Sequence, residues 1–350
     1  MRKPDCGGDS EVRASQTSAS QTSLEALWVG SRLRCTAADY RLQRLRQRTQ
    51  CRNAYRSADR SKLGVTLERA IQQPELQRGC LARRPSATEI ASDLAAPWGL
   101  IPLKDRSFLI AERDEGKIVR VENGSASQVR TIDEVDPGGE GGLLGLAITK
   151  DGKTVFAYYT AANDNRIVSM SWDGRELGAP KVILRGIPKG FIHNGGRMVV
   201  GPDDYLYVGT GESGTGRLSQ RKDSLGGKIL RLRLDGRPAP GNPFDNEVFS
   251  YGHRNVQGLA FDNEGRLWAS EFGQNRWDEL NLITKGADYG WPDVEGSGNV
   301  RGMTNPKVVW HTDEASPSGL AYWQNSLWMA GLRGQRLWEI PVDGTKTGDQ

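Results

Sequence analysis

The sequence predicts an all-β protein of the β-propeller type, and three observations indicate this. One pattern recurs five times between Trp98 and Leu337: a turn of small residues, an apolar strand, a polar turn and a second strand rich in aromatic residues. The copies follow one another at steps of 46 to 61 residues, and no helical periodicity interrupts them. Repeats of about 40–50 residues with four short strands each are typical of propeller blades, and longer steps indicate loop insertions.

Each copy is marked by a short triplet of residues at its first strand. A single blade cannot bury both of its faces, so the blades must pack side by side in a ring. Residues at one end of the central channel are therefore the expected site. The five triplets are Trp98-Gly99-Leu100, Leu144-Gly145-Leu146, Gly196-Arg197-Met198, Gln257-Gly258-Leu259 and Ser318-Gly319-Leu320.

Turn and strand signals set the extent of each blade. Between the last two predicted blades lies a long loop rich in glycine and asparagine, residues 288–299, and long ordered loops in compact folds are usually functional. The predicted blades are residues 97–120, about 140–174, 193–234, about 248–283 and about 308–342.

The chain stops at Gln350, where a further repeat is expected to begin. We therefore expect a six-bladed type of propeller with about five blades present, truncated at its C-terminal side. An unclosed ring leaves strand edges without partners, which predicts a poorly soluble product.

Composition divides the chain near residue 87. The formal net charge of +4 conceals 17 Lys and Arg against 8 Asp and Glu in residues 1–86, and 30 against 35 in residues 87–350. We expect an Arg-rich leader of low order over residues 1–87, either disordered or non-native through a misassigned start, and a propeller over residues 88–350. All four cysteines lie in the first part: Cys6, Cys35, Cys51 and Cys80.

The leader predicts no particular binding partner or cellular location. Its basic run over residues 41–48 has no RNA-binding motif, zinc-ligand spacing or aromatic platform beside it, so no nucleic-acid partner is expected. No signal peptide is recognisable, because the longest apolar stretch near the start, residues 24–30, is short and contains an acid. No stretch has the length of a membrane span, so no transmembrane segment is expected.

The first of three candidate motifs is His193-Asn-Gly-Gly-Arg197. A histidine before two glycines lies on a tight turn with room for a ligand, and neutral imidazole can accept a proton near pH 7. Nineteen residues later, Glu212 could orient the ring and stabilise its protonated form. The motif alone fits a turn histidine bonded to backbone equally well, and Glu212 alone fits a solvated loop acid.

The second motif runs from Ser250 to Gly258. Arg254 and Asn255 offer a forked cation and an amide, which suit a planar anionic ligand with carboxylates and carbonyls. The alternative for Arg254 is a surface ion pair. For His253, a packed ring is favoured over a ligand-binding role.

The third motif is a turn between Glu271 and Glu279 that contains Gly273. Exposed carbonyls in such a turn suit a hard cation such as calcium, which prefers oxygen ligands. Asp278 and Glu279 fit ordinary turn acids equally well. No EF-hand, P-loop, dinucleotide fingerprint or nucleophile elbow is present, which argues against nucleotide and serine-hydrolase chemistry.

With these motifs in this order along the chain, the sequence resembles the soluble sugar dehydrogenases that depend on pyrroloquinoline quinone (PQQ). These form the glucose/sorbosone dehydrogenase family of six-bladed propellers. The resemblance covers roughly residues 88–345. Its most specific stretches are Gly139-Glu-Gly-Gly-Leu-Leu144, residues 193–197, residues 251–258, and Asp278-Glu-Leu-Asn followed by Asp288-Tyr-Gly-Trp-Pro292.

The resemblance implies oxidation of the C1 hydroxyl of an aldose sugar to a lactone, with hydride passing to PQQ held by calcium and electrons leaving to an external acceptor. It implies that His193 is the general base and that Glu212 orients it. The other roles that it implies are cofactor contacts for Arg254, Asn255 and Arg333, a substrate contact for Glu140, and calcium ligation by the main-chain carbonyls of Gly273 and Gln274.

Two departures from the family pattern bear on the substrate. Glu140 stands where the best-known members have Gln, which exchanges an amide donor for a carboxylate and predicts a different sugar preference. Ile192 stands where they have a polar residue, which removes a substrate contact. The family's remaining quinone-binding arginines belong to the last blade, which this chain does not reach.

The alternative is a non-catalytic propeller of the same ancestry that binds a carbohydrate or a protein. The pairing of His193 with Glu212 favours the enzyme, because a scaffold has no need of a base with an orienting acid. A metal-dependent hydrolase would need a central cluster of carboxylates, which the blade starts do not supply. Family members generally work outside the cytoplasmic membrane, so a periplasmic or extracellular location is implied by resemblance only.

Overall fold

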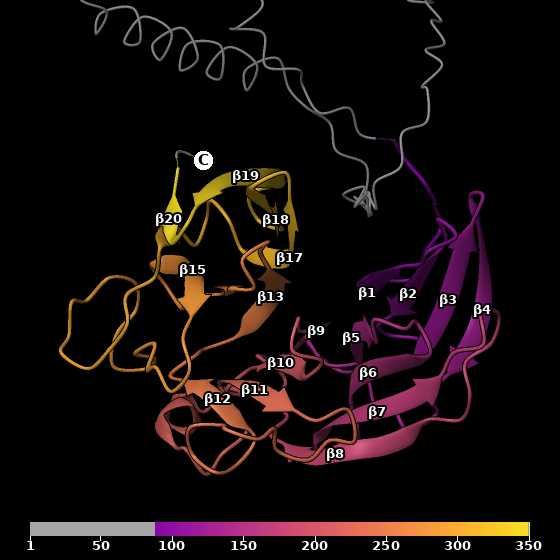
Figure 1. The fold of residues 1–350 in the computed structure, drawn as a ribbon, viewed down its shortest axis with the longest axis horizontal. Coiled ribbons are helices and arrows are strands. Elements are labelled where there is room, and N and C mark those ends of the chain that lie inside the picture. The colour runs from indigo at the N-terminus through magenta and orange to yellow at the C-terminus, as the bar shows by residue number, and fades with distance from the viewer. Residues whose placement is uncertain (1–87, 349) are drawn as a thin grey trace, which may run out of the picture.

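In the computed structural model, which describes residues 88–348 and 350, the chain forms five four-stranded antiparallel sheets arranged around a common centre (Figure 1). The predicted all-β fold with five propeller blades is therefore confirmed. The predicted leader, with its four cysteines, lies outside the described residues. The described residues contain no helix long and apolar enough to cross a membrane.

Each sheet is a meander whose first strand lies nearest the centre and whose fourth lies outermost (Figure 1). The first blade holds β1 (Pro97–Pro102), β2 (Phe108–Glu112), β3 (Lys117–Glu122) and β4 (Ser125–Thr131), and the second holds β5 (Leu143–Ile148), β6 (Thr154–Thr160), β7 (Asn165–Ser171) and β8 (Lys181–Ile187). The third holds β9 (Gly195–Val200), β10 (Leu206–Thr210), β11 (Lys228–Leu232) and β12 (Val248–Tyr251), with the short 3-10 helix η1 (Gly216–Gln220) between β10 and β11. The fourth holds β13 (Val256–Phe261), β14 (Leu267–Glu271), β15 (Trp277–Ile283) and β16 (Val308–His311), and the fifth holds β17 (Pro317–Trp323), β18 (Ser326–Gly331), β19 (Arg336–Asp343) and β20 (Lys346–Thr347).

Two of the predicted blade boundaries are wrong. The strand that begins at Val248 pairs with β11 and completes the third blade, and the strand that begins at Val308 pairs with β15 and completes the fourth. The prediction had assigned both to the following blade, because an outermost strand has sheet on one side only and lacks the pattern of the inner strands. The loop 288–299 consequently lies inside the fourth blade, between β15 and β16, and not between two blades.

The hydrophobic core lies between neighbouring blades. Strand β6 shows how one strand serves two such layers, because side chains alternate between the faces of a sheet. Phe156 and Tyr158 pack against the third blade, whereas Tyr159 packs on the side of the first blade. Similar clusters join the third blade to the fourth and the fourth to the fifth. The repeats are thus held together by shared clusters.

Adjacent first strands approach one another closely at the repeated glycines. A Cβ atom at Gly145 of β5 would lie 1.9 Å from the carbonyl oxygen of Gly196 in β9, and one at Gly99 of β1 would lie 2.4 Å from the carbonyl oxygen of Leu144. Both distances are far below contact distance, and both meet backbone atoms. Glycine is therefore required at the first two triplets because two backbones touch there.

The third copy has Arg197 where the other triplets have glycine, and this side chain crosses the channel. Its guanidinium lies over the ring of Trp98 at 4.1 Å from the centroid, and its Nε donates to the carbonyl of Gln257 at 2.8 Å. Desolvation lowers the pKa of Arg197 to about 10. A guanidinium stacked on indole in a region poor in water is a favourable cation–π contact. One side chain thus links the first strands of the first, third and fourth blades.

We expect Gly145→Ala to destabilise the fold strongly, because the added methyl group meets the backbone of the next blade. The expected loss is about 2–3 kcal/mol or more in the free energy of unfolding, measured by urea denaturation. Gly138→Ala is the matched control, since a Cβ at Gly138 meets nothing within 4 Å. Equal urea midpoints for the two variants would contradict the backbone contact.

Candidate active site

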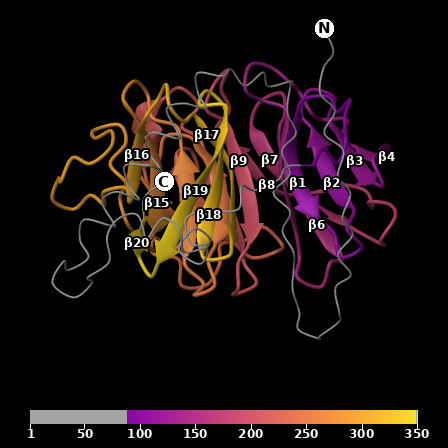
Figure 2. The same ribbon diagram turned by 90° about the horizontal axis from the view of Figure 1, so that it is seen from above.

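The predicted site residues gather at one end of the propeller. Figure 2 shows the blades from the side, with the strands running between the two ends of the molecule. Because the strands of a blade are antiparallel, its first strand begins at the end where its second strand finishes. His193 and Arg254 directly precede β9 and β13, whereas Glu212 and Gly273 follow β10 and β14. All four therefore lie at the same end.

His193 and Glu212 form a buried pair. The Nδ1 atom of His193 is hydrogen-bonded to Oε1 of Glu212, and the two residues are 7% and 2% exposed. Two glycines allow this approach: a Cβ at Gly211 would lie 1.9 Å from the carbonyl oxygen of His193, and one at Gly195 would lie 2.5 Å from the nitrogen of Gly211. The sequence places a histidine and an acid here, and the glycines bring them together.

This pairing determines what the imidazole can do. An ionised carboxylate can only accept a hydrogen bond, so Nδ1 of His193 carries the proton and Nε2 carries the lone pair. No described residue donates to Nε2 of His193. The second carboxylate oxygen of Glu212 is buried and has no partner. The ring of His193 is thus bonded to a carboxylate and not to backbone, an arrangement in which Nε2 can accept a proton.

Glu140 lies against the same histidine from the connection between the first and second blades. Its Oε2 accepts the backbone N–H of His193 at 2.7 Å, and its own N–H donates to the carbonyl of Phe191 at 2.9 Å. His193 has a left-handed backbone with φ of 57°, which is unfavourable for a histidine and needs support from its surroundings. Glu140 supplies that support. Phe191 and Ile192 beside it are exposed, at 79% and 39%.

Arg254 and Asn255 join the third blade to the fourth. The carbonyl of Arg254 accepts the N–H of Glu212, and Oδ1 of Asn255 accepts the N–H of Gly195 at 3.1 Å. The guanidinium of Arg254 lies 5.3 Å from the ring centroid of Trp291. Three donors in this group are buried without a partner: Nε of Arg254, Nδ2 of Asn255 and Nε1 of Trp291.

Burial lowers the pKa of Arg254, and the surrounding carboxylates act in the opposite direction. Unpaired buried donors are rare in folded proteins, and several in one place indicate a site for acceptor groups of a ligand. The carboxylates that favour the charged form of the Arg254 guanidinium are, in order of effect, Glu212, Glu295, Glu140 and Glu271.

The turn with Gly273 and Gln274 connects β14 to β15 and contains the predicted calcium ligands. A Cβ at Gly273 would lie 1.9 Å from the carbonyl oxygen of Trp277, so the turn closes too tightly for any other residue. Its N–H groups donate to the carboxylates of Asp278 and Glu295. Burial raises the pKa of Asp278, while the N–H donors of Gly273 and Ser316 lower it. Asp278 is therefore no ordinary exposed turn acid.

A buried polar network lies next to this turn. His253 is fully buried and stacks on Tyr289, and its ring nitrogens are bonded to Ser250 and Glu271. This is the packed ring that the sequence favoured for His253. Glu271 also accepts the backbone N–H of Arg254 at 2.8 Å, so the network fixes the position of that residue.

Three positioning groups were missed by sequence reasoning. Glu271 and Glu295 bond to residues in other loops, and the spacing of residues in the sequence does not predict such contacts. Lys228 is fully buried and donates through Nζ to the carbonyls of Leu218, Ser219 and Gly226, which holds the loop after Glu212 in place. Burial lowers the pKa of Lys228 to about 7. A lysine directly before the apolar pair Ile229 and Leu230 was the available signal for this position.

Arg333 does not contact the other predicted site residues. It lies exposed in the connection between β18 and β19, and it has no hydrogen bond or ion pair to any described residue. The described residues also contain no group of three His, Cys, Asp or Glu side chains placed to hold a metal ion.

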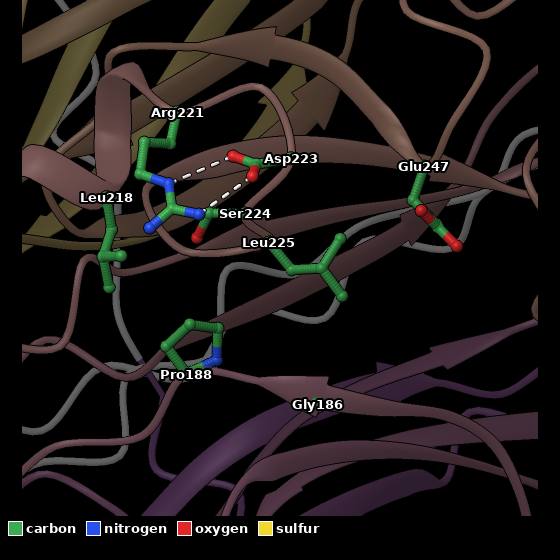
Figure 3. Close-up of a pocket in the computed structure, with 8 residues that line it drawn as sticks. All are labelled: Gly186, Pro188, Leu218, Arg221, Asp223, Ser224, Leu225 and Glu247. Atoms are coloured by element: carbon green, nitrogen blue, oxygen red, sulfur yellow. Dashed lines mark hydrogen bonds and ion pairs between the residues drawn. The ribbon is translucent and has the colours of Figure 1, made fainter.

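A hollow of about 490 Å³ lies away from these residues, where the end of β8 meets the connection between β10 and β11 (Figure 3). The Arg221 and Asp223 side chains on its wall face each other in an exposed ion pair, as the dashed lines show. None of the predicted site residues lines it. Arg221 and Asp223 satisfy each other at the surface, and the buried unpaired donors beside His193 are the stronger indication of a ligand site.

Comparison with known proteins decides the family. The glucose/sorbosone dehydrogenase family model matches residues 94–350. The chain belongs to the glucose/sorbosone dehydrogenase family. This was the family that the motifs resembled.

Among the relatives of this family member is quinoprotein glucose dehydrogenase B of Acinetobacter calcoaceticus, 36% identical over 249 residues, which cover 59% of this chain and 52% of the relative. The chain thus spans about half the length of that relative. Aldose sugar dehydrogenase YliI of Escherichia coli is 27% identical over 300 residues, with coverage of 74% and 81%. A solved structure of the PQQ-bound form of aldose sugar dehydrogenase from Streptomyces coelicolor is 55% identical, with a TM-score of 0.73 and coverage of 75% and 81%.

One pH-dependent property of this family member follows from the network around Glu271. Burial, and after it the neighbouring Glu271 carboxylate, raise the pKa of Glu279 to about 8, although Asn281 and the N–H of Gly296 donate to it and act in the opposite direction. The fold therefore favours protonated Glu279. The stability that protonation contributes is present below pH 4.5 and is lost as the pH rises towards 8.

We expect Glu279→Gln to remove most of this pH dependence, because the amide resembles the protonated acid. Between pH 5 and 8.5 the wild-type chain should lose on the order of 3 kcal/mol more unfolding free energy than the variant, measured by urea denaturation in EDTA. Glu264→Gln, at an exposed turn, is the control and should keep the wild-type profile. Parallel profiles for wild type and Glu279→Gln would contradict the raised pKa.

Proposed function

We propose that this family member oxidises the C1 hydroxyl of an aldose sugar to a lactone, with PQQ and calcium as its cofactors. The observation that carries the proposal is the buried His193–Glu212 pair beside the unpaired donors of Arg254 and Asn255. The names of the relatives support the same reaction, since they include a quinoprotein glucose dehydrogenase, an aldose sugar dehydrogenase and a PQQ-bound structure.

The residues fit the cofactors chemically. PQQ is a planar quinone with carboxylates and carbonyls, and it needs cationic and amide donors. Arg254 and Asn255 supply such donors, and both have a buried nitrogen without a partner. Arg333 is proposed as a further cation from the fifth blade. The main-chain carbonyls of Gly273 and Gln274 are proposed as oxygen ligands for calcium.

When bound, PQQ supplies a hydride acceptor and calcium supplies a Lewis acid. His193 takes the proton of the C1 hydroxyl at Nε2, because its Nδ1 proton is held by Glu212. Glu212 keeps the ring oriented and stabilises the imidazolium that forms. Glu140 holds the backbone of His193 and presents a carboxylate next to the sugar. An external acceptor would take up the electrons.

The exposed side chains of Phe191 and Ile192 adjoin the base and make one side of its surroundings apolar. They offer no hydrogen bonds to sugar hydroxyls, and the carboxylate of Glu140 cannot donate one. The carboxylate of Glu140 can accept hydrogen bonds from sugar hydroxyls, so we expect the polar contacts on this side of the site to be limited to hydroxyls that donate to Glu140.

We expect His193→Ala to lower kcat for sugar-dependent dye reduction by about 10²- to 10⁴-fold, because the proton acceptor is lost. Glu212→Gln should lower it by roughly tenfold or more, since the imidazolium loses its carboxylate. The assay uses the full chain with PQQ and calcium, and Glu264→Gln is the control. Turnover by His193→Ala at the wild-type rate would exclude His193 as the base. Sugar binding by the wild-type chain without any turnover would favour the alternative of a binding propeller.

We expect Arg254→Ala to raise the dissociation constant for PQQ at least tenfold, since a charged hydrogen-bond donor contributes about 1.5–3 kcal/mol. Binding is measured by equilibrium dialysis with calcium present. The matched control is Arg221→Ala, which removes an exposed guanidinium that pairs with Asp223. Unchanged PQQ binding in the Arg254 variant would place the cofactor elsewhere.

A further inference from the structure

The turn between β14 and β15 holds its N–H groups in an unusual arrangement. A single oxygen of Glu295, Oε1, accepts four consecutive backbone N–H groups, those of Gln274, Asn275, Arg276 and Trp277, at 2.7, 2.9, 2.9 and 3.1 Å. The N–H before them, that of Gly273, donates to Asp278 at 3.0 Å. Five consecutive N–H groups thus point at two carboxylates.

This arrangement fixes the direction of two carbonyls. In a planar trans peptide, the C=O of one residue and the N–H of the next point in opposite directions. The C=O of Gly273 shares a peptide with the N–H of Gln274, and the C=O of Gln274 shares one with the N–H of Asn275. Because both N–H groups point at Glu295, both carbonyl oxygens must point away from it.

The carboxylate also affects these carbonyls electronically. A peptide whose N–H donates to a charged acceptor is polarised, and its carbonyl oxygen becomes a stronger acceptor. Glu295 is half-buried and comes from the loop 288–299, twenty-one residues from Gln274, so the turn cannot adopt this shape through its own sequence alone. Gly273 fits the same requirement, since a side chain there would lie 2.8 Å from Oε1 of Glu295.

We propose that Glu295 is the positioning residue of the calcium site: it sets the direction and strength of the Gly273 and Gln274 carbonyls without touching the ion. This inference rests on the proposed function, which assigns calcium to those two carbonyls. It gives the loop 288–299 a specific role, which is to bring one carboxylate beneath the turn.

The test measures Ca²⁺ binding to the full chain by isothermal titration after EDTA treatment, with no PQQ or sugar present. Glu295→Gln keeps the shape of the side chain but removes its charge, and the dissociation constant for Ca²⁺ should rise at least tenfold. Asp293→Asn is the matched control: this exposed acid lies two residues away, so it reports the effect of charge alone. Its dissociation constant should stay within about twofold of wild type.

A second readout separates positioning from general stability. With wild type and Glu295→Gln, urea midpoints are measured in EDTA, and PQQ uptake is measured at increasing Ca²⁺. The expected result is that excess Ca²⁺ restores PQQ uptake by the variant, which a collapsed site would not show. A lower urea midpoint with unchanged Ca²⁺ affinity would overturn the inference and leave Glu295 a structural residue. Failure of the wild-type chain to bind Ca²⁺ at all would overturn the calcium assignment itself.

Discussion

Contact between backbones at the centre of the propeller is the constraint on which the rest of the structure depends. The first strands of neighbouring blades approach until Gly145 meets the carbonyl of Gly196, and this requires residues without side chains. The same closeness brings the beginnings of β9 and β13 together with the ends of β10 and β14. Residues from separate repeats can therefore bond directly, as Asn255 does with Gly195. The site is a consequence of how tightly the blades pack.

Around that centre, carboxylates outnumber cationic side chains, and each carboxylate bonds to a particular protein group. Glu212 is bonded to an imidazole, Glu271 to His253 and the backbone of Arg254, and Glu295 to a turn of backbone. Each carboxylate is thus assigned to a protein group and positions it. Among the described residues of this region, the buried donors without a partner belong to Arg254, Asn255 and Trp291, so the region offers donors although it is acidic.

The fold and the motif residues could largely be predicted from the sequence, whereas the outer strands and the positioning residues could not. Inner strands carry a strong signal, since they are apolar on both faces and begin at a marked triplet. β4 and β8 are partly exposed and lack that signal, and β12 begins with an apolar residue that resembles the start of a new repeat. Glu295 bonds to residues about twenty positions earlier, through a loop whose shape no local rule determines. The predicted roles of the site residues stay predictions until they are tested.

The stack of Arg197 on Trp98 has a consequence for how the blades are held together. The guanidinium reaches from β9 to the ring of Trp98 in β1 and bonds to the carbonyl of Gln257 in β13, so one residue contacts the first strands of two other blades. A change at this one position therefore acts on three repeats at once.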